Sequence, residues 1–466
     1  MVFSSAVFLF GFLPVLLFLY FVSPQKLKNG VLLVFSLLFY YVGGVGAIAV
    51  LLAVVGMDYV FALAIVRGRH PKWWLILAVT GNIGLLFYYK YFNFFLENAN
   101  RLFGMNLAAG NIVLPIGISF FTFQALSYVI DVYHGRVSVQ KNPFRLLLYV
   151  SLFPQLVAGP IVRYQTVEQE LSLRAVSLDD VTAGVERFVR GLGKKMLIAN
   201  QMGMLADIVY ALDEPDTPVA FLGAAAYMFQ IFYDFSGYSD MAIGLGRMFG
   251  FHFLENFDYP YISASVTEFW RRWHMSLSAW FRDYVYIPLG GNRKGAARQV
   301  FNLLIVWLLT GLWHGASWNF VLWGLYYFVF LVLEKFLLKG VLKRCPKPLS
   351  HAVTLVIVLA GWVLFRAETL PACGEMLQAL FGFRFSVLGW REAVIYLQTY
   401  GVYFVPAILF CMPVYPKLCK AAESIKNERR RGFFEVCRYG FLLGVFVVSI
   451  IFLAHSSYNP FIYFRF

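Results

Sequence analysis

One ionisable side chain, His314, lies near the middle of a long apolar run from Gln299 to Leu333. The run contains no Asp, Glu, Lys or Arg, and it is longer than the roughly 20 residues that one transmembrane helix needs. An ionisable group at membrane depth is costly and is usually functional. Because imidazole exchanges protons near neutral pH, we interpret His314 as a candidate general base. The alternative is a structural histidine that forms a hydrogen bond between helices.

Two hydroxyl side chains flank this histidine. If the segment is helical, Thr310 at i−4 and Ser317 at i+3 lie on the same face as His314 and could orient its ring. Gly311 and Gly315 also flank it, and they allow other backbone to approach closely or the chain to bend. This local pattern favours a cavity around the histidine that is lined by protein groups.

A second candidate region is the stretch from Glu255 to Gly295, in which aromatic and basic residues alternate. This composition is typical of an interfacial helix whose rings lie at the level of the lipid headgroups. The rings and guanidinium groups in question are Trp270, Trp273, Trp280, Phe281, Arg271, Arg272 and Arg282.

Simple anchoring at the interface would account for this stretch, but a binding role is the alternative. Arg271, Arg272, Arg293 and Lys294 could form a basic mouth for an anionic donor, since guanidinium groups match phosphates well. His274 lies in the same stretch and is a second candidate for catalysis or for lining a donor channel.

The composition places these residues in a membrane protein. Of the 466 residues, 60% are hydrophobic, 19% aromatic and 14% charged, whereas soluble domains contain about 25% charged residues. The net charge of +14 comes from short Lys and Arg clusters between apolar spans, which the positive-inside rule explains without nucleic acid. The five cysteines show no metal-type spacing, so we expect free thiols and no metal site.

The apolar segments predict an all-α polytopic fold with roughly 10–12 transmembrane helices, plus re-entrant and interfacial helices around a central funnel. Residues 1–466 are expected to form one integral membrane domain, with both termini extracytoplasmic because the basic loops alternate with the spans. Besides the run around His314, the expected spans are Phe3 to Val22, Val31 to Tyr41, Ala47 to Val66, Trp73 to Phe95, Leu114 to Tyr133, Val219 to Ile243, Ala352 to Phe365, Val394 to Met412 and Phe433 to Ala454.

Basic residues bound the run around His314 on both sides, with Arg298 before it and Lys335 after it. Both ends are therefore expected in the cytoplasm, which predicts a hairpin or a re-entrant pair with His314 near the bend.

The middle of the chain has a broken pattern. Pro154, Gly159 and Pro160 interrupt an apolar segment and predict a half-membrane element. The segment from Val181 to Asn200 mixes charged and apolar residues and predicts an amphipathic surface helix. Asp234 and Asp240 interrupt a span, and we expect both to be structural and bonded to Tyr, Ser or Arg side chains, because buried charges are normally paired.

Five segments together resemble the membrane-bound O-acyltransferase family, and most closely its bacterial polysaccharide branch. They are LPIGISFFTFQALSYVIDVYHG, FPQLVAGPIVR, IFYDFSGYSDMAIGLGRMFG, FWRRWHMSLSAWFRDYVYIPLGGNR and GLWHGASWNFVLWG. The resemblance covers nearly the whole chain. It implies a bundle of many helices around a thinned centre, a cytoplasmic acyl thioester donor, an invariant histidine at His314 and a second histidine position at His274.

Acyl transfer from a thioester to an alcohol fits the residues around His314. The imidazole would take the hydroxyl proton, and Trp313, Ser317 or a backbone N–H could donate to the oxyanion. We therefore expect an O-acetyltransferase that passes an acetyl group from cytoplasmic acetyl-CoA toward the hydroxyls of an exported or cell-wall polysaccharide. It would act in the inner (cytoplasmic) membrane, with no permanently bound cofactor and with an extracytoplasmic acetyltransferase as partner.

The last residues, PFIYFRF, form an F-x-Y-x-x-F pattern with Phe461, Tyr463 and Phe466. An aromatic belt at the outer interface is one interpretation. The pattern also resembles a C-terminal motif of this branch that is associated with acyl relay, which implies that His314 deprotonates Tyr463 and that Tyr463 takes the acyl group.

Two other functions are compatible with parts of this pattern. One is D-alanyl transfer from a carrier protein to teichoic acid. The other, of a different class, is a proton-coupled carrier or flippase. A carrier would more often show paired repeats and carboxylates within the spans, whereas here the polar features cluster around one histidine and one basic stretch.

Overall fold

The computed structural model describes residues 2–157, 159–455 and 458–462, and within these ranges the regular structure is helical, with no strand. Among the described residues, eight helices are long and apolar enough to cross a membrane, and three shorter apolar helices accompany them. The predicted all-α polytopic membrane fold is confirmed. By chain contacts the molecule divides into two compact units. The chain passes from one to the other within α10 (Leu178–Gly193), within α12 (Thr217–Met248) and again between Leu254 and Glu255.

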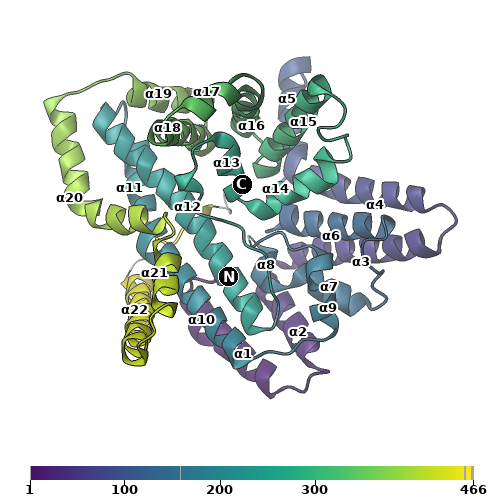
Figure 1. The fold of residues 1–466 in the computed structure, drawn as a ribbon. Coiled ribbons are helices and arrows are strands. Elements are labelled where there is room, and N and C mark those ends of the chain that lie inside the picture. Colours follow the sequence, from purple (N-terminus) through teal and green to yellow (C-terminus); the bar gives the residue numbers. More distant parts are fainter. Residues whose placement is uncertain (1, 158, 456–457, 463–466) are drawn as a thin grey trace. The chain divides into compact units, whose positions relative to one another are not determined.

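The first unit comprises Met1–Phe188 and Met241–Leu254. Within it α3, α4 and α6 lie side by side (Figure 1). Besides parts of α10 and α12, its elements are η1 (Val7–Phe12), α1 (Leu13–Val22), α2 (Lys28–Tyr41), α3 (Val45–Arg67), α4 (Pro71–Leu86), η2 (Phe87–Tyr91), α5 (Phe92–Phe103), α6 (Ile118–Tyr133), α7 (Pro143–Ser151), α8 (Phe153–Leu156) and α9 (Tyr164–Ser172).

The predicted break in the middle of the chain is present in this unit. Asn142 caps α7, which ends at Ser151, and α8 is a single turn beginning beside Pro154. Gly117, in the left-handed region with φ +75°, lies so close to α8 that a Cβ would be 2.6 Å from the Leu156 carbonyl oxygen. The broken segment is thus packed within protein, as freed backbone groups require.

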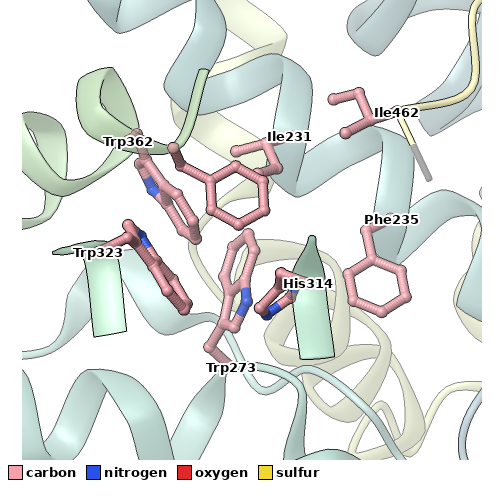
Figure 2. A pocket seen from close by; sticks show the side chains of 8 residues that line it. Ile231, Phe235, Trp273, His314, Trp323, Trp362 and Ile462 are labelled. Carbon is pink, nitrogen blue, oxygen red and sulfur yellow. The ribbon is translucent and has the colours of Figure 1, made fainter. Parts of the chain in front are cut away.

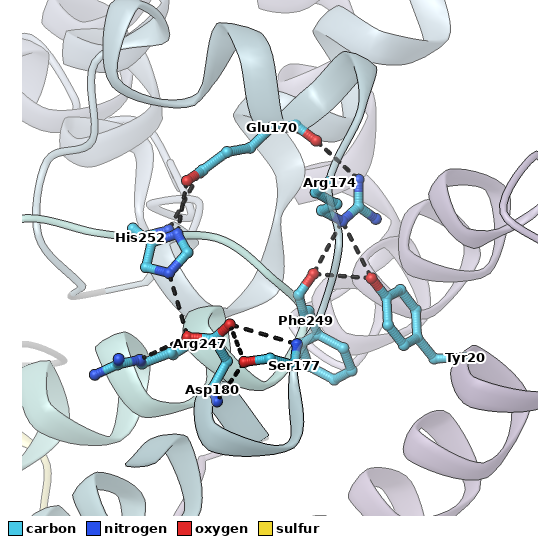
Figure 3. Close-up of polar contacts among 8 residues, drawn as sticks. All are labelled: Tyr20, Glu170, Arg174, Ser177, Asp180, Arg247, Phe249 and His252. Atoms are coloured by element: carbon cyan, nitrogen blue, oxygen red, sulfur yellow. Dashed lines mark hydrogen bonds and ion pairs between the residues drawn. The ribbon is translucent and has the colours of Figure 1, made fainter. Parts of the chain in front are cut away.

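A polar network joins α1, α9 and the segment after α12 (Figure 3). Buried Arg174 donates to the Phe249 carbonyl oxygen at 2.9 Å and to the Tyr20 hydroxyl at 3.1 Å. His252 Nδ1 lies 2.8 Å from Glu170 Oε1, and its Nε2 lies 3.5 Å from Asp180 Oδ1.

Asp180, at the start of α10, is surrounded by donors. The Ser177 hydroxyl donates to Asp180 at 2.7 Å, and Arg247 Nε donates at 3.2 Å. These contacts favour the charged carboxylate. The Ser177 hydrogen bond first, and then those from Arg247 and His252, lower the pKa of Asp180 from 3.8 to about 2.

The second unit comprises Val189–Asp240 and Glu255–Phe466 and contains the candidate site. Of the eight long apolar helices, α12 is the most buried. Besides parts of α10 and α12, the elements are η3 (Lys194–Ala199), α11 (Asn200–Tyr210), η4 (Pro260–Ile262), α13 (Val266–Arg272), α14 (Met275–Phe281), η5 (Arg282–Tyr286), α15 (Ala296–His314), α16 (Trp318–Val332), η6 (Leu333–Leu337), α17 (Lys339–Arg344), α18 (Lys347–Arg366), α19 (Leu370–Phe381), α20 (Val387–Phe410), α21 (Val414–Glu423) and α22 (Glu428–His455).

The uncharged run around His314 forms a tight helical hairpin, α15 and α16, and the predicted bend lies at His314. A Cβ at Gly311 would lie 2.3 Å from the Phe320 carbonyl oxygen. A Cβ at Gly324 would lie equally close, 2.3 Å, to the Trp307 carbonyl oxygen. Only glycine permits this backbone contact, so the glycines fix the spacing of the two helices that carry the histidine.

Two expectations for single helices need correction. The expected amphipathic helix is present as α10, but the segment does not remain at the surface as far as Asn200, because α10 passes into the π-helical η3, where Lys195 is buried. The aromatic and basic stretch forms two short helices, α13 and α14, separated by Trp273 and His274.

The two aspartates of α12 are paired, as predicted, and among the described residues each forms an ion pair with a lysine. Lys195 Nζ lies 2.6 Å from Asp234 Oδ1, and Lys194 Nζ lies 2.6 Å from Asp240 Oδ2. Both lysines belong to η3, so two adjacent ion pairs join η3 to α12.

Candidate active site

His314 is the last residue of α15, and its side chain is 6% exposed. Its ring makes edge contacts with Trp323 of α16 and Phe365 of α18, at centroid distances of 5.0 and 5.1 Å. The helix ends here because Gly315 adopts an extended conformation, with φ −168°. A buried imidazole is thus held at a helix end among aromatic rings from two neighbouring helices.

His274 lies beside the same aromatic cluster. Its Nδ1 is 3.1 Å from Asn256 Oδ1, which also accepts from the Ser276 backbone N–H at 3.3 Å. Because Oδ1 accepts there, Nδ1 of His274 carries the proton, and Nε2 is left with its lone pair. Among the described residues Nε2 has no hydrogen-bond partner.

The environment of His274 keeps it neutral. Burial lowers the pKa of His274 from 6.5 to about 3, so the ring is uncharged at neutral pH. Its backbone lies in the left-handed region, with φ +45°, which is uncommon for a residue with a side chain and recurs at functional sites.

The three residues predicted to assist His314 lie close to it in the chain. The Trp313 ring contacts both histidines, at centroid distances of 5.0 Å from His314 and 5.7 Å from His274. The Thr310 hydroxyl donates to the Val306 carbonyl oxygen at 2.7 Å, within its own helix. The helical i+3 relation of Ser317 to His314 is wrong, because α15 ends at His314 and Ser317 is the N-cap of α16.

A small cavity of about 10 Å³ adjoins His314, room for roughly one water molecule. Figure 2 shows His314 among the aromatic rings of this cavity, with Ile462 entering from the C-terminal segment. The lining residues are Ile231, Phe235, Trp273, His314, Trp323, Trp362, Phe365 and Ile462. The C-terminal segment therefore reaches the cavity of the candidate base. Tyr463, the predicted acyl relay, is the next residue in the chain but lies outside the described residues.

The four residues predicted to bind an anionic donor differ in their surroundings. Arg271, Arg293 and Lys294 are exposed. Arg272 instead lies 2.8 Å from Asp258 Oδ2 and 3.0 Å from Glu268 Oε1, so two carboxylates already neutralise it.

The expectation that the aromatic rings of this stretch lie among lipid headgroups is wrong. Trp273, Trp280 and Phe281 are buried. Trp273 packs against Trp362 at a centroid distance of 4.7 Å, and Trp270 packs against Tyr327 at 4.8 Å. Of these rings, Trp273 and Trp362 line the cavity beside His314. Glu334 holds α13 in place by accepting from the Val266 N–H at 2.6 Å.

Several residues of the site were not predicted from the sequence. Trp323 and Phe365 lie in apolar segments, and no pattern among their neighbours in the sequence indicates that they contact His314. Asn256 and Ile462 were also missed, although an isolated Asn in an otherwise aromatic segment is a signal for a buried hydrogen bond. In the described part of the chain no group of three His, Cys, Asp or Glu side chains is placed to hold a metal ion.

Comparison with known proteins identifies the family. The sequence profile described as MBOAT, membrane-bound O-acyltransferase family, matches residues 138–370, which include both histidines. The probable alginate O-acetylase AlgI of Pseudomonas putida is 40% identical, over 100% of both chains. The peptidoglycan O-acetyltransferase of Helicobacter pylori is 30% identical, over 100% of this chain and 98% of that protein.

A more distant relative is the teichoic acid D-alanyltransferase of Bacillus subtilis, 30% identical over 55% of this chain and 70% of that protein. The two relatives described above that match over nearly the full length are thus a probable alginate O-acetylase and a peptidoglycan O-acetyltransferase. The chain belongs to the membrane-bound O-acyltransferase family and is an O-acyltransferase.

Proposed function

We propose that this protein passes an acetyl group from cytoplasmic acetyl-CoA across the membrane toward hydroxyls of an exported or cell-wall polysaccharide. The polysaccharide acceptor is supported by the alginate and peptidoglycan O-acetyl-transferring relatives. The observation that carries the mechanism is that His314 and Ile462 line one cavity, because it brings the residue before Tyr463 to the candidate base.

In the first step His314 takes the proton of the Tyr463 hydroxyl. The phenolate oxygen attacks the thioester carbonyl carbon, and a tetrahedral oxyanion forms. The C–S bond then breaks, and CoA leaves as a thiol after taking the proton from the imidazolium. The product is an acetyl ester on Tyr463. Because a phenol has a pKa of about 10, this ester is a better acyl donor than an ester of a sugar hydroxyl.

In the second step a nucleophilic hydroxyl of an extracytoplasmic acetyltransferase partner attacks the ester carbonyl carbon, the C–O bond to Tyr463 breaks, and the hydroxyl proton passes to the Tyr463 oxygen. The partner then transfers the acetyl group to a polysaccharide hydroxyl in the same way, which regenerates its own hydroxyl. Exposed Arg271, Arg293 and Lys294 bind the phosphates of the donor, and Arg272 orders α13, the helix that carries Arg271. Trp313, next to His314 and in ring contact with both histidines, is the proposed donor to the oxyanion, together with Ser317 and the backbone at the bend. His274, held neutral, lines the same region.

The experiment uses the purified full-length protein in nanodiscs with labelled acetyl-CoA. We expect label in the C-terminal peptide that contains Tyr463, located by mass spectrometry, and no label there in Tyr463→Phe. The phenylalanine keeps the ring and therefore any aromatic anchoring of the tail. The same assay with a D-alanyl carrier protein tests the alternative donor, for which we expect no label.

Two results would contradict the proposal. Labelling by the D-alanyl carrier but not by acetyl-CoA would favour the D-alanyl function. Normal acetylation of the polysaccharide by Tyr463→Phe, in cells that also contain the partner, would show that the tail only anchors the last helix.

A further inference from the structure

The Lys195–Asp234 ion pair is almost completely buried, with the two side chains 4% and 2% exposed. A buried pair is stable only when further hydrogen bonds satisfy both groups. Here both charged groups also bind the backbone of the C-terminal segment. We call residues 458–462 the tail.

The charges match the backbone groups that they bind. The Ile462 N–H donates to Asp234 Oδ2 at 2.8 Å, and the Lys195 ammonium donates to the Pro460 carbonyl oxygen. A carboxylate thus accepts from an amide and an ammonium donates to a carbonyl, on either side of Phe461. These charge-assisted hydrogen bonds are stronger than neutral ones, and a shift of the tail by one residue would break both.

Two more contacts hold the start of the tail. Asn200 donates through Nδ2 to the Tyr458 carbonyl oxygen at 3.2 Å. The Tyr458 hydroxyl donates to Asp207 Oδ2 at 2.5 Å, and the other oxygen of Asp207 accepts from Arg366 at 2.5 Å. Gly203 leaves room for this ring, since a Cβ there would lie 2.9 Å from the Tyr458 hydroxyl oxygen.

We infer that Lys195, Asn200, Asp207 and Asp234, here called the tail clamp, are positioning residues that fix the register of the C-terminal tail at the cavity of His314. Ile462 is both a clamped residue and a lining residue of that cavity. The clamp therefore fixes the last described residue of the tail, Ile462, at the cavity of His314. The inference about tail position stands on these contacts alone, and only its consequence for activity rests on the proposed function.

The neighbouring lysine of η3 belongs to a second, less buried ion pair that serves as a control. Lys194 and Asp240 form an ion pair of the same length, 2.6 Å, on the same two elements, η3 and α12. That pair takes no part in the tail contacts described above. It reports what η3 loses when a lysine–aspartate pair is removed while the tail contacts described above remain in place.

The test compares the full-length wild type, Lys195→Met with Asp234→Leu, and the control Lys194→Met with Asp240→Leu, each in nanodiscs. Replacing both members of a buried pair with apolar residues of similar size is usually tolerated. Hydrogen–deuterium exchange of the peptide from Tyr458 onward reports the tail, and peptides from η3 and α12 report the bundle. Labelling by acetyl-CoA is measured in parallel.

We expect the clamp variant to lose tail protection at least tenfold, with η3 and α12 still protected, and the control to match the wild type. Acetyl transfer should fall in the clamp variant by a similar factor, with an unchanged donor KM. Unchanged tail protection in the clamp variant would overturn the inference. So would an equal loss of protection in η3 and α12, since the pair would then only join the helices. Loss of tail protection with normal acetyl transfer would keep the clamp and contradict the proposed relay.

Discussion

Asn256 accepts a hydrogen bond from His274 across 3.1 Å, and this bond fixes which nitrogen of the buried ring carries the proton. The same oxygen accepts from the Ser276 hydroxyl at 2.9 Å. One amide oxygen thus holds both the ring of His274 and the start of α14.

Asn256→Leu is expected to destabilise the protein and lower acetyl transfer. The variant removes the shared acceptor, and leaving buried donors unsatisfied costs about 1–3 kcal/mol. Ser276→Ala is the control, because it removes one donor and leaves the bond to His274 in place. Melting temperatures in detergent measure the stability of both variants. A melting temperature for Asn256→Leu equal to that of the wild type would show that the bond contributes nothing.

Arg271→Ala and Arg272→Ala should have different effects. Arg271 is exposed, so its loss should raise the donor KM severalfold, and added salt should shrink the difference by screening. Arg272 already faces Asp258 and Glu268, so its loss should lower the melting temperature rather than donor affinity. Donor KM at low and high salt measures the first effect. Equal changes in donor KM for the two variants would contradict the assignment of donor binding to Arg271 and of a structural role to Arg272.

Gly311→Ala should destabilise the hairpin and abolish most activity. The added Cβ would lie 2.3 Å from the Phe320 carbonyl oxygen, and overpacking of this kind costs about 1–3 kcal/mol or more. Gly374→Ala in α19 is the matched control, since nothing lies within 4 Å of its Cβ position and alanine favours helix. Wild-type melting temperatures for both variants would contradict this tight contact between the two helices.

The contribution of Asp180 to stability should depend on pH. Its pKa falls from 3.8 to about 2 in the folded protein, so the stabilisation is fully present above pH 3.8 and is lost as the pH falls toward 2. Asp180→Asn should therefore melt below the wild type at pH 6, and the difference should shrink below pH 4. Melting curves across this range measure it. If the difference in melting temperature between the wild type and Asp180→Asn grew on acidification, the charged Asp180 carboxylate would not be the stabilising group.

The sequence was sufficient to predict the elements whose signals are local. The bend at His314 follows from one uncharged run between two basic boundaries, and the broken helix follows from Pro154 and Gly159. The membrane character follows from the composition. Each of these features depends on residues that are close together in the chain.

The rest of the site depends on contacts between distant residues. Aromatic composition does not distinguish a ring facing lipid from one facing protein, so Trp273 and Trp280 were expected at the interface although both are buried. Nothing near Trp273 in the sequence indicated the left-handed backbone of His274. The bond from Ile462 to Asp234 joins the end of the chain to a distant helix, and no periodic pattern records it.

The most direct test of the account measures acetyl transfer by His314→Ala in a single turnover from labelled acetyl-CoA, with correct folding of the variant checked by its melting temperature. Removing a general base without adding a charge should slow transfer by about 10²-fold or more while the protein remains folded. His314→Gln, which keeps a polar side chain but cannot act as a base at neutral pH, should be equally slow. Transfer within about threefold of the wild type in a folded variant would contradict the assignment of His314 as the base.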